Sequence, residues 1–357
     1  MKKKFATIFL IVFILTSTIP VFAFSPNDEV AVLREIALYA PKVFGKNQDW
    51  RIVQETELYD VDDSISSYCF DIVSLDDKQI YAYVIVSVDE NDFPIRLFGY
   101  NGNSAYFGKK TAKAYYFGTL DFFLKKSNGF ENARTGATFS LTEINELFKS
   151  DKHEKVVTDY SQIRQNYRTD ILRESASEVA QISQCTSLQW RTGCAPTSVA
   201  MMIKTKYQYL DGNTLIDYLA DYMSTDADGS TDFYKITSGT KKYFSDRQFF
   251  TAPVTCGWNS TNIIGAPRKG ITYNSKESYK ESISAGFPVG VYCSSSNVAT
   301  VGYPNGIGAH MMTGIGYSFG ANGDFITCYT TNIADGEVSF PLTSSGLNNH
   351  AWFWLKW

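Results

Sequence analysis

The segment around Cys194 constrains the fold of this chain most strongly. Gly193 precedes the cysteine, and Pro196 stands where the missing N–H of proline costs nothing in the first turn of a helix. Apolar residues then recur at helical spacing, at Val199, Met202, Ile203 and Tyr207. The pattern predicts a helix that begins at Cys194 and packs by one apolar face.

A thiol at the start of a helix has a chemical consequence. The positive end of the peptide dipoles favours a thiolate there, and the thiolate is the nucleophilic form of cysteine. Cys194 is therefore a candidate nucleophile. The alternative is a buried, inert cysteine that begins a core helix.

The bulk composition limits the class of protein. The chain has 357 residues, 44% hydrophobic and 20% charged, with a net charge of −4, which is typical of a globular protein of two or three domains. No basic stripe interleaved with aromatic residues suggests a nucleic-acid partner. The six cysteines form no CxxC pair, and the three histidines are widely spaced, so we expect neither a metal site nor a cofactor.

The first residues predict the compartment. Lys2–Lys4 form a positive start, Phe5–Ile19 are mostly apolar, and Val21-Phe22-Ala23 has small residues at the usual cleavage spacing. This is typical of a secretory signal peptide over residues 1–23. The alternative is an uncleaved membrane anchor. No later run approaches the roughly 20 apolar residues needed to cross a bilayer, so we expect a secreted, extracellular protein without stable membrane insertion after signal cleavage.

The rest of the chain divides into two predicted units and a connector. Residues 24–145 form an α+β unit, whose expected elements are helices over 28–43 and 109–125 and strands over 51–59, 67–73, 80–88 and 95–100. Residues 146–182 are polar and charged and predict an exposed connector with some helix. Such segments are where proteolytic nicking concentrates.

Residues 183–357 form the second predicted unit. We expect a helix that ends near Ala285, stopped by Gly286, and a strand over 287–293. Strands over 309–317 and 325–331 flank Gly320-Ala321-Asn322-Gly323, and Asn-Gly between such runs is a strong hairpin signal.

A cysteine nucleophile needs a base, which is usually histidine. His153 stands in the charged connector and His350 in the C-terminal segment, whereas His310 begins a predicted strand after a glycine-rich loop. We select His310 as the candidate base. The alternative is a structural histidine at a strand start.

The predicted hairpin and the segment before Cys194 supply further candidates. Antiparallel pairing places residues of about 330–335 opposite His310, a window that contains Thr330, Asn332 and Asp335. Asn332, or secondly Asp335, would hold the imidazole ring and fix its tautomer. The Cys194 backbone N–H and the Gln189 side-chain amide would bind an oxyanion, with Gln184 less favoured. All of these polar side chains also suit ordinary turn or surface positions.

A family resemblance rests on these residues. Gly193-Cys194-Ala195-Pro196-Thr197-Ser198 resembles the Gly-Cys-x-Pro-Thr-Ser signature of bacterial papain-like cysteine peptidases similar to the double-glycine leader peptidases. Gly286-Phe287-Pro288-Val289, with Ala309-His310 and Gly316-Tyr317, resembles their later pattern, so that the resemblance covers about residues 184–335. Tyr81–Ser87, Pro94 and Phe98-Gly99-Tyr100 resemble the propeptide of streptopain-type peptidases. The Gln189–Cys194 interval is one residue shorter than usual in papain-like peptidases, and Thr330 or Asn332 stands where leader-type peptidases often carry aspartate.

The resemblance implies an α+β fold in which a papain-like catalytic domain, with its cysteine helix on an antiparallel sheet, follows an α+β prodomain. It implies a secreted cysteine peptidase made as a zymogen, with Cys194 as nucleophile, His310 as general base and acid, and Gln189 and Asn332 in support. The expected partners are a peptide or protein substrate and the N-terminal unit as intramolecular inhibitor. Two alternatives remain: a transglutaminase or amidase on the same fold, and a non-catalytic extracellular binding protein.

Overall fold

The computed structural model describes residues 29–90, 92–109, 112–117, 122–134, 136–144, 178–247, 254–258, 275–293, 310–331, 337–342 and 350–357. The helices are α1 (Glu29–Val43), α4 (Cys194–Lys206), α5 (Gly212–Tyr222), α6 (Phe233–Asp246) and α7 (Ser275–Ser284). The N-terminal strands are β1 (Trp50–Tyr59), β2 (Ile65–Ser74), β3 (Tyr81–Ser87), β4 (Ile95–Tyr100), β5 (Ala114–Tyr116), β6 (Phe122–Lys126), β7 (Gly129–Asn132) and β8 (Thr138–Phe139). The later strands are β9 (Glu178–Gln181), β10 (Thr255–Trp258), β11 (Val289–Cys293), β12 (His310–Gly320), β13 (Gly323–Tyr329), β14 (Val338–Pro341) and β15 (His350–Lys356).

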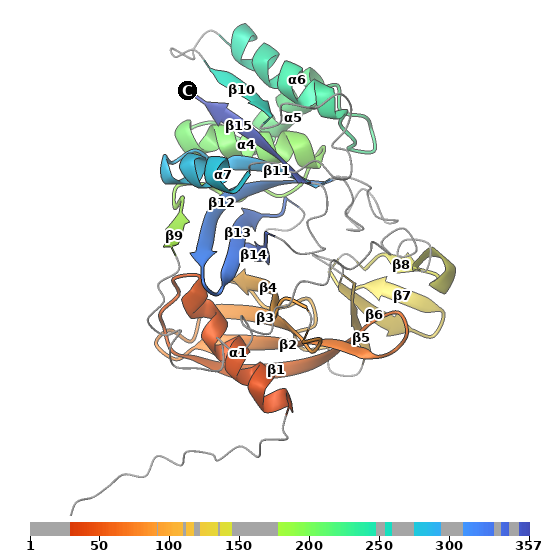
Figure 1. The fold of residues 1–357 in the computed structure, drawn as a ribbon. Coiled ribbons are helices and arrows are strands. Elements are labelled where there is room, and N and C mark those ends of the chain that lie inside the picture. The colour runs from red at the N-terminus through yellow and green to blue at the C-terminus, as the bar shows by residue number, and fades with distance from the viewer. Residues whose placement is uncertain are drawn as a thin grey trace, which may run out of the picture.

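One continuous sheet runs through the molecule (Figure 1). Its order is β10-β15-β11-β12-β13-β14-β4-β3-β2-β1-β5-β6-β7-β8, and β9 pairs with β12 off this path. Neighbouring strands are antiparallel except β1 and β5, which are parallel. The structure is thus a mixed α+β fold with a large sheet.

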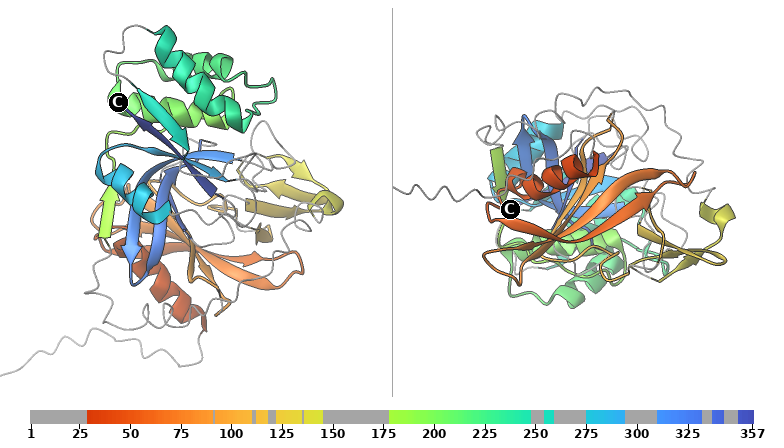
Figure 2. Two further views of the ribbon diagram at one scale, coloured as in Figure 1. Left: turned by 45° about the horizontal axis from the view of Figure 1, so that its top comes forward. Right: turned by 90° about the horizontal axis from the view of Figure 1, so that it is seen from below.

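The N-terminal elements form a helix on a curved meander. Strands β1–β4 pair consecutively, and α1 covers one face of them (Figure 2). Buried aliphatic and aromatic side chains from α1 and the strands fill the space between, among them Ile36, Ala40, Phe70 and Val84. The sequence patterns for α1 and for β1–β4 are therefore confirmed to within two residues at each end.

The predicted helix over 109–125 is wrong. That region contains β5 and β6, which pair with each other as antiparallel strands. Tyr115 and Phe123 pack on one side of this pair, whereas Tyr116, Phe122 and Leu124 pack on the other. Because both faces of these strands are buried, apolar residues stand at nearly every position and match helical spacing by accident.

In the later part of the chain, helices cover both faces of the sheet. Met311 of β12 packs with α4, α5 and α6, whereas Met312, its neighbour, packs with Tyr279 of α7. Asp211 and Asp232 cap the first turns of α5 and α6 by accepting hydrogen bonds from backbone N–H groups. α7 ends as predicted before Gly286, whose φ of 81° suits glycine.

α4 is buried more completely than an amphipathic helix. Its residues from Ala195 to Ile203 are all buried, because the helix lies between α5 and the strands β11 and β12. The predicted start at Cys194 is confirmed, but the single apolar face is not.

The β12–β13 hairpin forms where the sequence predicts it. Gly320 pairs with Gly323, so β12 and β13 are joined by the predicted tight turn. The five cysteines whose side chains the structure describes are all free. Within the described ranges, no helix has both the length and the apolar character that crossing a membrane requires.

Candidate active site

The loop before α4 holds Cys194 at the first position of the helix. A side chain at Gly193 would meet the backbone oxygen of Gly229, because a Cβ built there lies 2.7 Å from it. The Gly193 carbonyl accepts hydrogen bonds from the backbone N–H (3.2 Å) and the hydroxyl (2.7 Å) of Thr197. Glycine is therefore needed before the cysteine for close packing, and the first turn is fixed.

Two buried hydroxyls fasten α4 to β12. Ser198 Oγ donates to the Met312 carbonyl at 2.8 Å, and Thr313 Oγ1 donates to Ser198 Oγ at 2.9 Å. Both side chains are fully buried. Cys194 lies one helical turn before this contact, about 6 Å along the axis, and His310 lies two or three strand residues before it, roughly 7–10 Å. The first residue of each element lies at the same end of the α4–β12 contact, because the Met311 N–H lowers the pKa of the Cys194 thiol.

The Cys194 sulfur lies near this end of β12, but no hydrogen bond joins it to the His310 ring, whose Nδ1 has no partner among the described residues. Burial raises the pKa of the thiol, and the backbone N–H of Met311, the residue after His310, lowers it in part. The N–H groups of Ala195 and of Cys194 itself, at the start of α4, act in the same direction. The N–H groups at the helix start lower the thiol pKa, but desolvation outweighs them, so the thiolate that the sequence predicts is not favoured in this structure.

The His310 ring is buried and held from one side. Its Nε2 lies 2.8 Å from the carbonyl oxygen of Thr330 and 3.5 Å from Thr331 Oγ1. Because a carbonyl only accepts, Nε2 carries the proton in this arrangement. Nδ1 has no hydrogen-bond partner within the part of the chain that the structure describes.

Burial also sets the charge of the imidazole. It lowers the pKa of His310 from 6.5 to about 4, against the hydrogen bond to Thr330, which raises it. With the thiol pKa raised, both groups are neutral near pH 7. The site therefore holds a neutral thiol and a neutral imidazole whose Nδ1 lone pair is available as a base.

Thr331 has an uncommon backbone conformation at this position. Its φ is 67°, which is unusual for a β-branched residue. The Thr331 carbonyl accepts from the Trp190 N–H at 2.6 Å, and its hydroxyl donates to the Met311 carbonyl at 3.4 Å. This local strain is held in place by contacts to both walls of the site.

The predicted oxyanion residue follows the same segment. Gln189 is exposed and directly precedes Trp190, so its backbone is tied to the Thr331 side of the site. Asp217 of α5 steadies the residues between Trp190 and Cys194, because it accepts from Arg191 Nε (2.8 Å) and Thr192 Oγ1 (2.9 Å). Gln184 is also exposed. The role of either amide remains a prediction.

Several predicted residues cannot be compared with the structure. Asn332, Asp335 and His153 lie outside the described residues, as does the proposed signal peptide over 1–23. His350 begins β15, paired with β11. The ring partner seen in the structure is Thr330, a residue of the predicted window, but it acts through its backbone carbonyl and not through a side chain. Sequence analysis did not indicate this carbonyl or the Met311 N–H, because every residue carries a carbonyl and nearly every residue an N–H.

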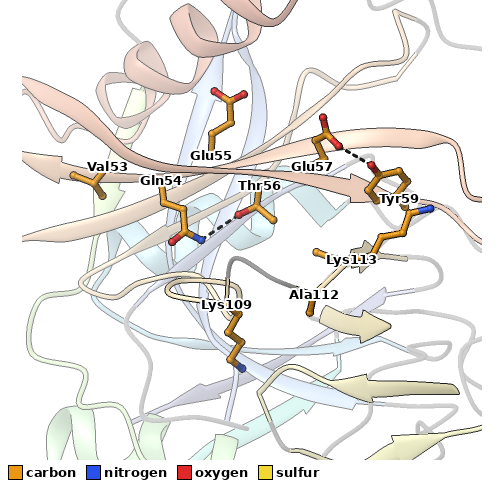
Figure 3. A pocket seen from close by; sticks show the side chains of 10 residues that line it. Val53, Gln54, Glu55, Thr56, Glu57, Tyr59, Lys109, Ala112 and Lys113 are labelled. Atoms are coloured by element: carbon orange, nitrogen blue, oxygen red, sulfur yellow. Dashed lines mark hydrogen bonds between the residues drawn. The ribbon is translucent and has the colours of Figure 1, made fainter. Parts of the chain in front are cut away.

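A pocket of about 610 Å³ lies elsewhere, in the N-terminal unit (Figure 3). Its lining consists of Val53, Gln54, Glu55, Thr56, Glu57, Tyr59, Lys109, Ala112, Lys113 and Ala114, none of them a predicted site residue. Its charged groups have partners within the protein: Glu55 pairs with Arg34, Glu57 accepts from Tyr59, and Lys113 pairs with Asp63. Nothing in this lining resembles the chemistry at Cys194.

Comparison with known proteins bears on the unit that contains Cys194 and His310. Residues 176–342 match the sequence model of the Peptidase_C39 like family. This match supports a papain-like cysteine peptidase family for that part of the chain, and with it hydrolase activity of the cysteine-peptidase type. No curated protein matches the chain.

Proposed function

We propose that this chain is a secreted cysteine peptidase, made as a precursor, in which Cys194 is the nucleophile and His310 the general base and acid. One observation carries the assignment. The backbone N–H of Met311, next to His310, lowers the pKa of the Cys194 thiol at the start of α4, while the buried imidazole keeps Nδ1 without a partner among the described residues. The family match over residues 176–342 supports the same chemistry.

The tautomer of His310 decides which ring nitrogen acts as the base. The Thr330 carbonyl accepts a hydrogen bond from Nε2–H, so Nδ1 is the nitrogen that removes the thiol proton as sulfur attacks the scissile carbonyl carbon. Because thiol and imidazole are both neutral before reaction, this transfer accompanies the attack. The imidazolium then gives the proton to the leaving amine, and a thioester to Cys194 remains.

Deacylation reverses the roles. Nδ1 takes a proton from water, and the hydroxyl oxygen attacks the thioester carbon. Collapse of the tetrahedral intermediate releases the acid and the Cys194 sulfur, which recovers the proton from the imidazolium. The Cys194 N–H, free of an intrahelical partner at the first turn of α4, is one proposed oxyanion donor. Gln189 is the other, and Asn332 or Asp335 would add support beyond the Thr330 carbonyl.

Secretion and latency are part of the proposal. The basic start and apolar run of residues 1–23 support export, and the polar composition of residues 146–182 supports a cleavable connector. The N-terminal unit would restrain activity until that connector is cut.

The test is peptide hydrolysis by purified protein, before and after limited proteolysis. We expect activity in wild type and a loss of at least about 10³-fold in Cys194→Ala. A peptidyl electrophile should add once, at Cys194, as located by mass spectrometry. Cys256→Ala, which removes a buried thiol of β10, is the control for loss of a cysteine and should keep full activity. Equal hydrolysis by wild type and Cys194→Ala would refute the assignment.

An amine acceptor in the same assay separates hydrolysis from acyl transfer. A peptidase releases free acid even when a primary amine is abundant, whereas a transglutaminase yields mainly the amide. Predominant amide formation would reassign the reaction while keeping Cys194 and His310 in their roles.

A further inference from the structure

The described N-terminal unit (residues 29–144) and the C-terminal unit (residues 178–357) share a sheet and a core. β4 of the first pairs with β14 of the second, with Gly99 opposite Val338 and Phe98 opposite Ser339. The Tyr100 N–H donates to the Glu337 carbonyl at 2.8 Å and extends this ladder. We call this boundary between the two units the seam.

Aromatic side chains interlock across the seam. Phe325 of β13 lies edge-on to Phe44 (4.9 Å between ring centroids) and to Phe93 (5.2 Å). Phe44 in turn stacks on Phe98 at 4.5 Å. Phe325 is fully buried in the cluster that α1 forms with β1–β4, so the C-terminal unit completes the core of the N-terminal unit.

The β12–β13 turn reaches into the same cluster. A Cβ built on Gly323 would overlap the Phe93 ring, which shows how closely the turn approaches the N-terminal unit. Ser318 Oγ donates to the Val43 carbonyl at the end of α1. A second hydrophobic cluster continues through the seam, with Ile85 and Leu97 on one side and Val338 and Phe340 on the other.

Polar contacts at the seam are specific as well. Lys46 Nζ lies 3.2 Å from Glu337 Oε2, and their side chains are only 16% and 14% exposed. The same ammonium donates to Gln181 of β9 and lies 4.0 Å from the centre of the Tyr100 ring. Removing one partner of such a largely desolvated ion pair is costly, because it leaves the other charge buried without compensation.

From these contacts we infer that the N-terminal unit is a permanent, non-covalently held subunit of the enzyme, which stays bound after the chain between the units is cut. Separation would expose Phe325, Phe44 and the facing β4 and β14 edges to water, which opposes release of a soluble N-terminal piece. The consequence for activity rests on the proposed function: activation by cleavage would yield a two-piece peptidase rather than one freed of its N-terminal unit.

The experiment inserts the recognition sequence of a specific endopeptidase, flanked by glycine–serine spacers, after Tyr160 of the full chain. The Cys194→Ala background excludes self-cleavage. After complete cutting, we expect both pieces to migrate together in size exclusion and native mass spectrometry, and to part only in denaturant. Separation of the pieces in native buffer would overturn the inference.

Charge reversal tests the seam itself. Lys46→Glu or Glu337→Lys alone should raise the dissociation constant of the cut complex by about 10-fold or more, since like charges then face each other in a mostly buried contact. The double reversal should recover most of the loss. Arg34→Glu breaks an ion pair within the N-terminal unit and is the control that should leave association unchanged. No effect of either single reversal would contradict the role of this pair at the seam.

Activity of the cut chain with Cys194 intact distinguishes the two proposals. Hydrolysis by the co-migrating two-piece form supports both. Pieces that stay together without hydrolysis would contradict the proposed peptidase function and leave the permanent association standing. Hydrolysis that appears only once the pieces are separated would overturn the permanent-subunit inference and keep the peptidase.

Discussion

Asp71 in the N-terminal unit and His310 in the C-terminal unit are both buried titratable groups, but they differ in how completely they are hydrogen-bonded. Both Asp71 oxygens accept hydrogen bonds from Ser104, one from the N–H at 2.6 Å and one from the hydroxyl at 2.7 Å. His310 is bonded through Nε2, and its Nδ1 has no partner among the described residues. Buried polar atoms are normally satisfied, so the incomplete group is the candidate for chemistry.

Burial displaces both groups toward their neutral forms. It raises the pKa of Asp71 from 3.8 to about 6, against the two Ser104 hydrogen bonds and the nearby Arg134. It lowers the pKa of His310 from 6.5 to about 4. Asp71 therefore acts as a mostly ionised structural anchor near pH 7, whereas His310 is a neutral base.

The largest expected effect is on catalytic activity, which should depend on His310 but not on Asp71. His310→Gln should lower kcat/KM for peptide hydrolysis by about 10³-fold or more, because His310 is the proposed acceptor of the thiol proton. Asp71→Asn should change kcat/KM by no more than about 3-fold if the protein folds, as shown by circular dichroism. Equal losses in the two variants would remove the distinction.

The second expected effect is on the free energy of unfolding, to which the hydrogen-bonded Asp71 should contribute. Asp71→Ala leaves the N–H and hydroxyl of Ser104 without their acceptors in a buried site, so we expect a loss of about 2–4 kcal/mol in the free energy of unfolding. Asp71→Asn keeps one acceptor and should lose less. Urea denaturation of both variants measures the difference, and a loss below about 0.5 kcal/mol in Asp71→Ala would show that the network is not an anchor.

The two groups should also give pH dependences of opposite sign. Between pH 6.5 and about 4 the unfolded chain binds more protons at position 310 than the folded one, so this contribution to stability falls as pH falls. Between pH 3.8 and about 6 the folded chain binds more protons at Asp71, so that contribution falls as pH rises. Each is worth up to about 3 kcal/mol.

Comparing the pH dependence of stability in each variant with that of wild type isolates the contribution of each group. Relative to wild type, His310→Gln should lose less stability on acidification, and Asp71→Asn should lose less as pH rises from about 4 to about 6. Urea midpoints over this range provide the comparison. Variants whose pH profiles run parallel to wild type would show that these groups do not titrate as their burial implies.

A smaller effect concerns the α4–β12 contact that positions the site. Thr313→Val removes the donor to Ser198 with little change in volume, and we expect a loss of about 1–2 kcal/mol in stability. If the contact also sets the distance between Cys194 and His310, kcat should fall while KM changes little. Thr205→Val, which removes a hydroxyl bonded within α4, is the matched control. A similar kcat in both variants would limit the contact to a structural role.

Local patterns were sufficient for much of this structure. Pro196 and the apolar spacing after it placed the start of α4, and Asn322-Gly323 placed the β12–β13 turn. Both signals lie within a few residues of the feature they specify. The helix expected over 109–125 failed because strands buried on both faces lack the alternation that identifies a strand.

Other features left no signal in any one segment. The pairing of Gly99 with Val338 joins residues far apart in the chain, and neither segment shows by itself which edge it will meet. The Thr330 carbonyl and the Met311 N–H are backbone groups, whose roles depend only on where the chain is folded. Side-chain candidates such as Cys194 and His310 could be selected from sequence because few residue types perform that chemistry.

Alkylation of Cys194 by iodoacetamide, measured against pH in wild type and His310→Gln, tests the central pair most directly. We predict a wild-type rate at neutral pH at least about 10-fold above that of His310→Gln, since only a thiol that can pass its proton to Nδ1 reacts readily when its own pKa is raised. Cys194 labelling that is equally fast in both proteins at every pH would contradict the assignment of His310 as its base.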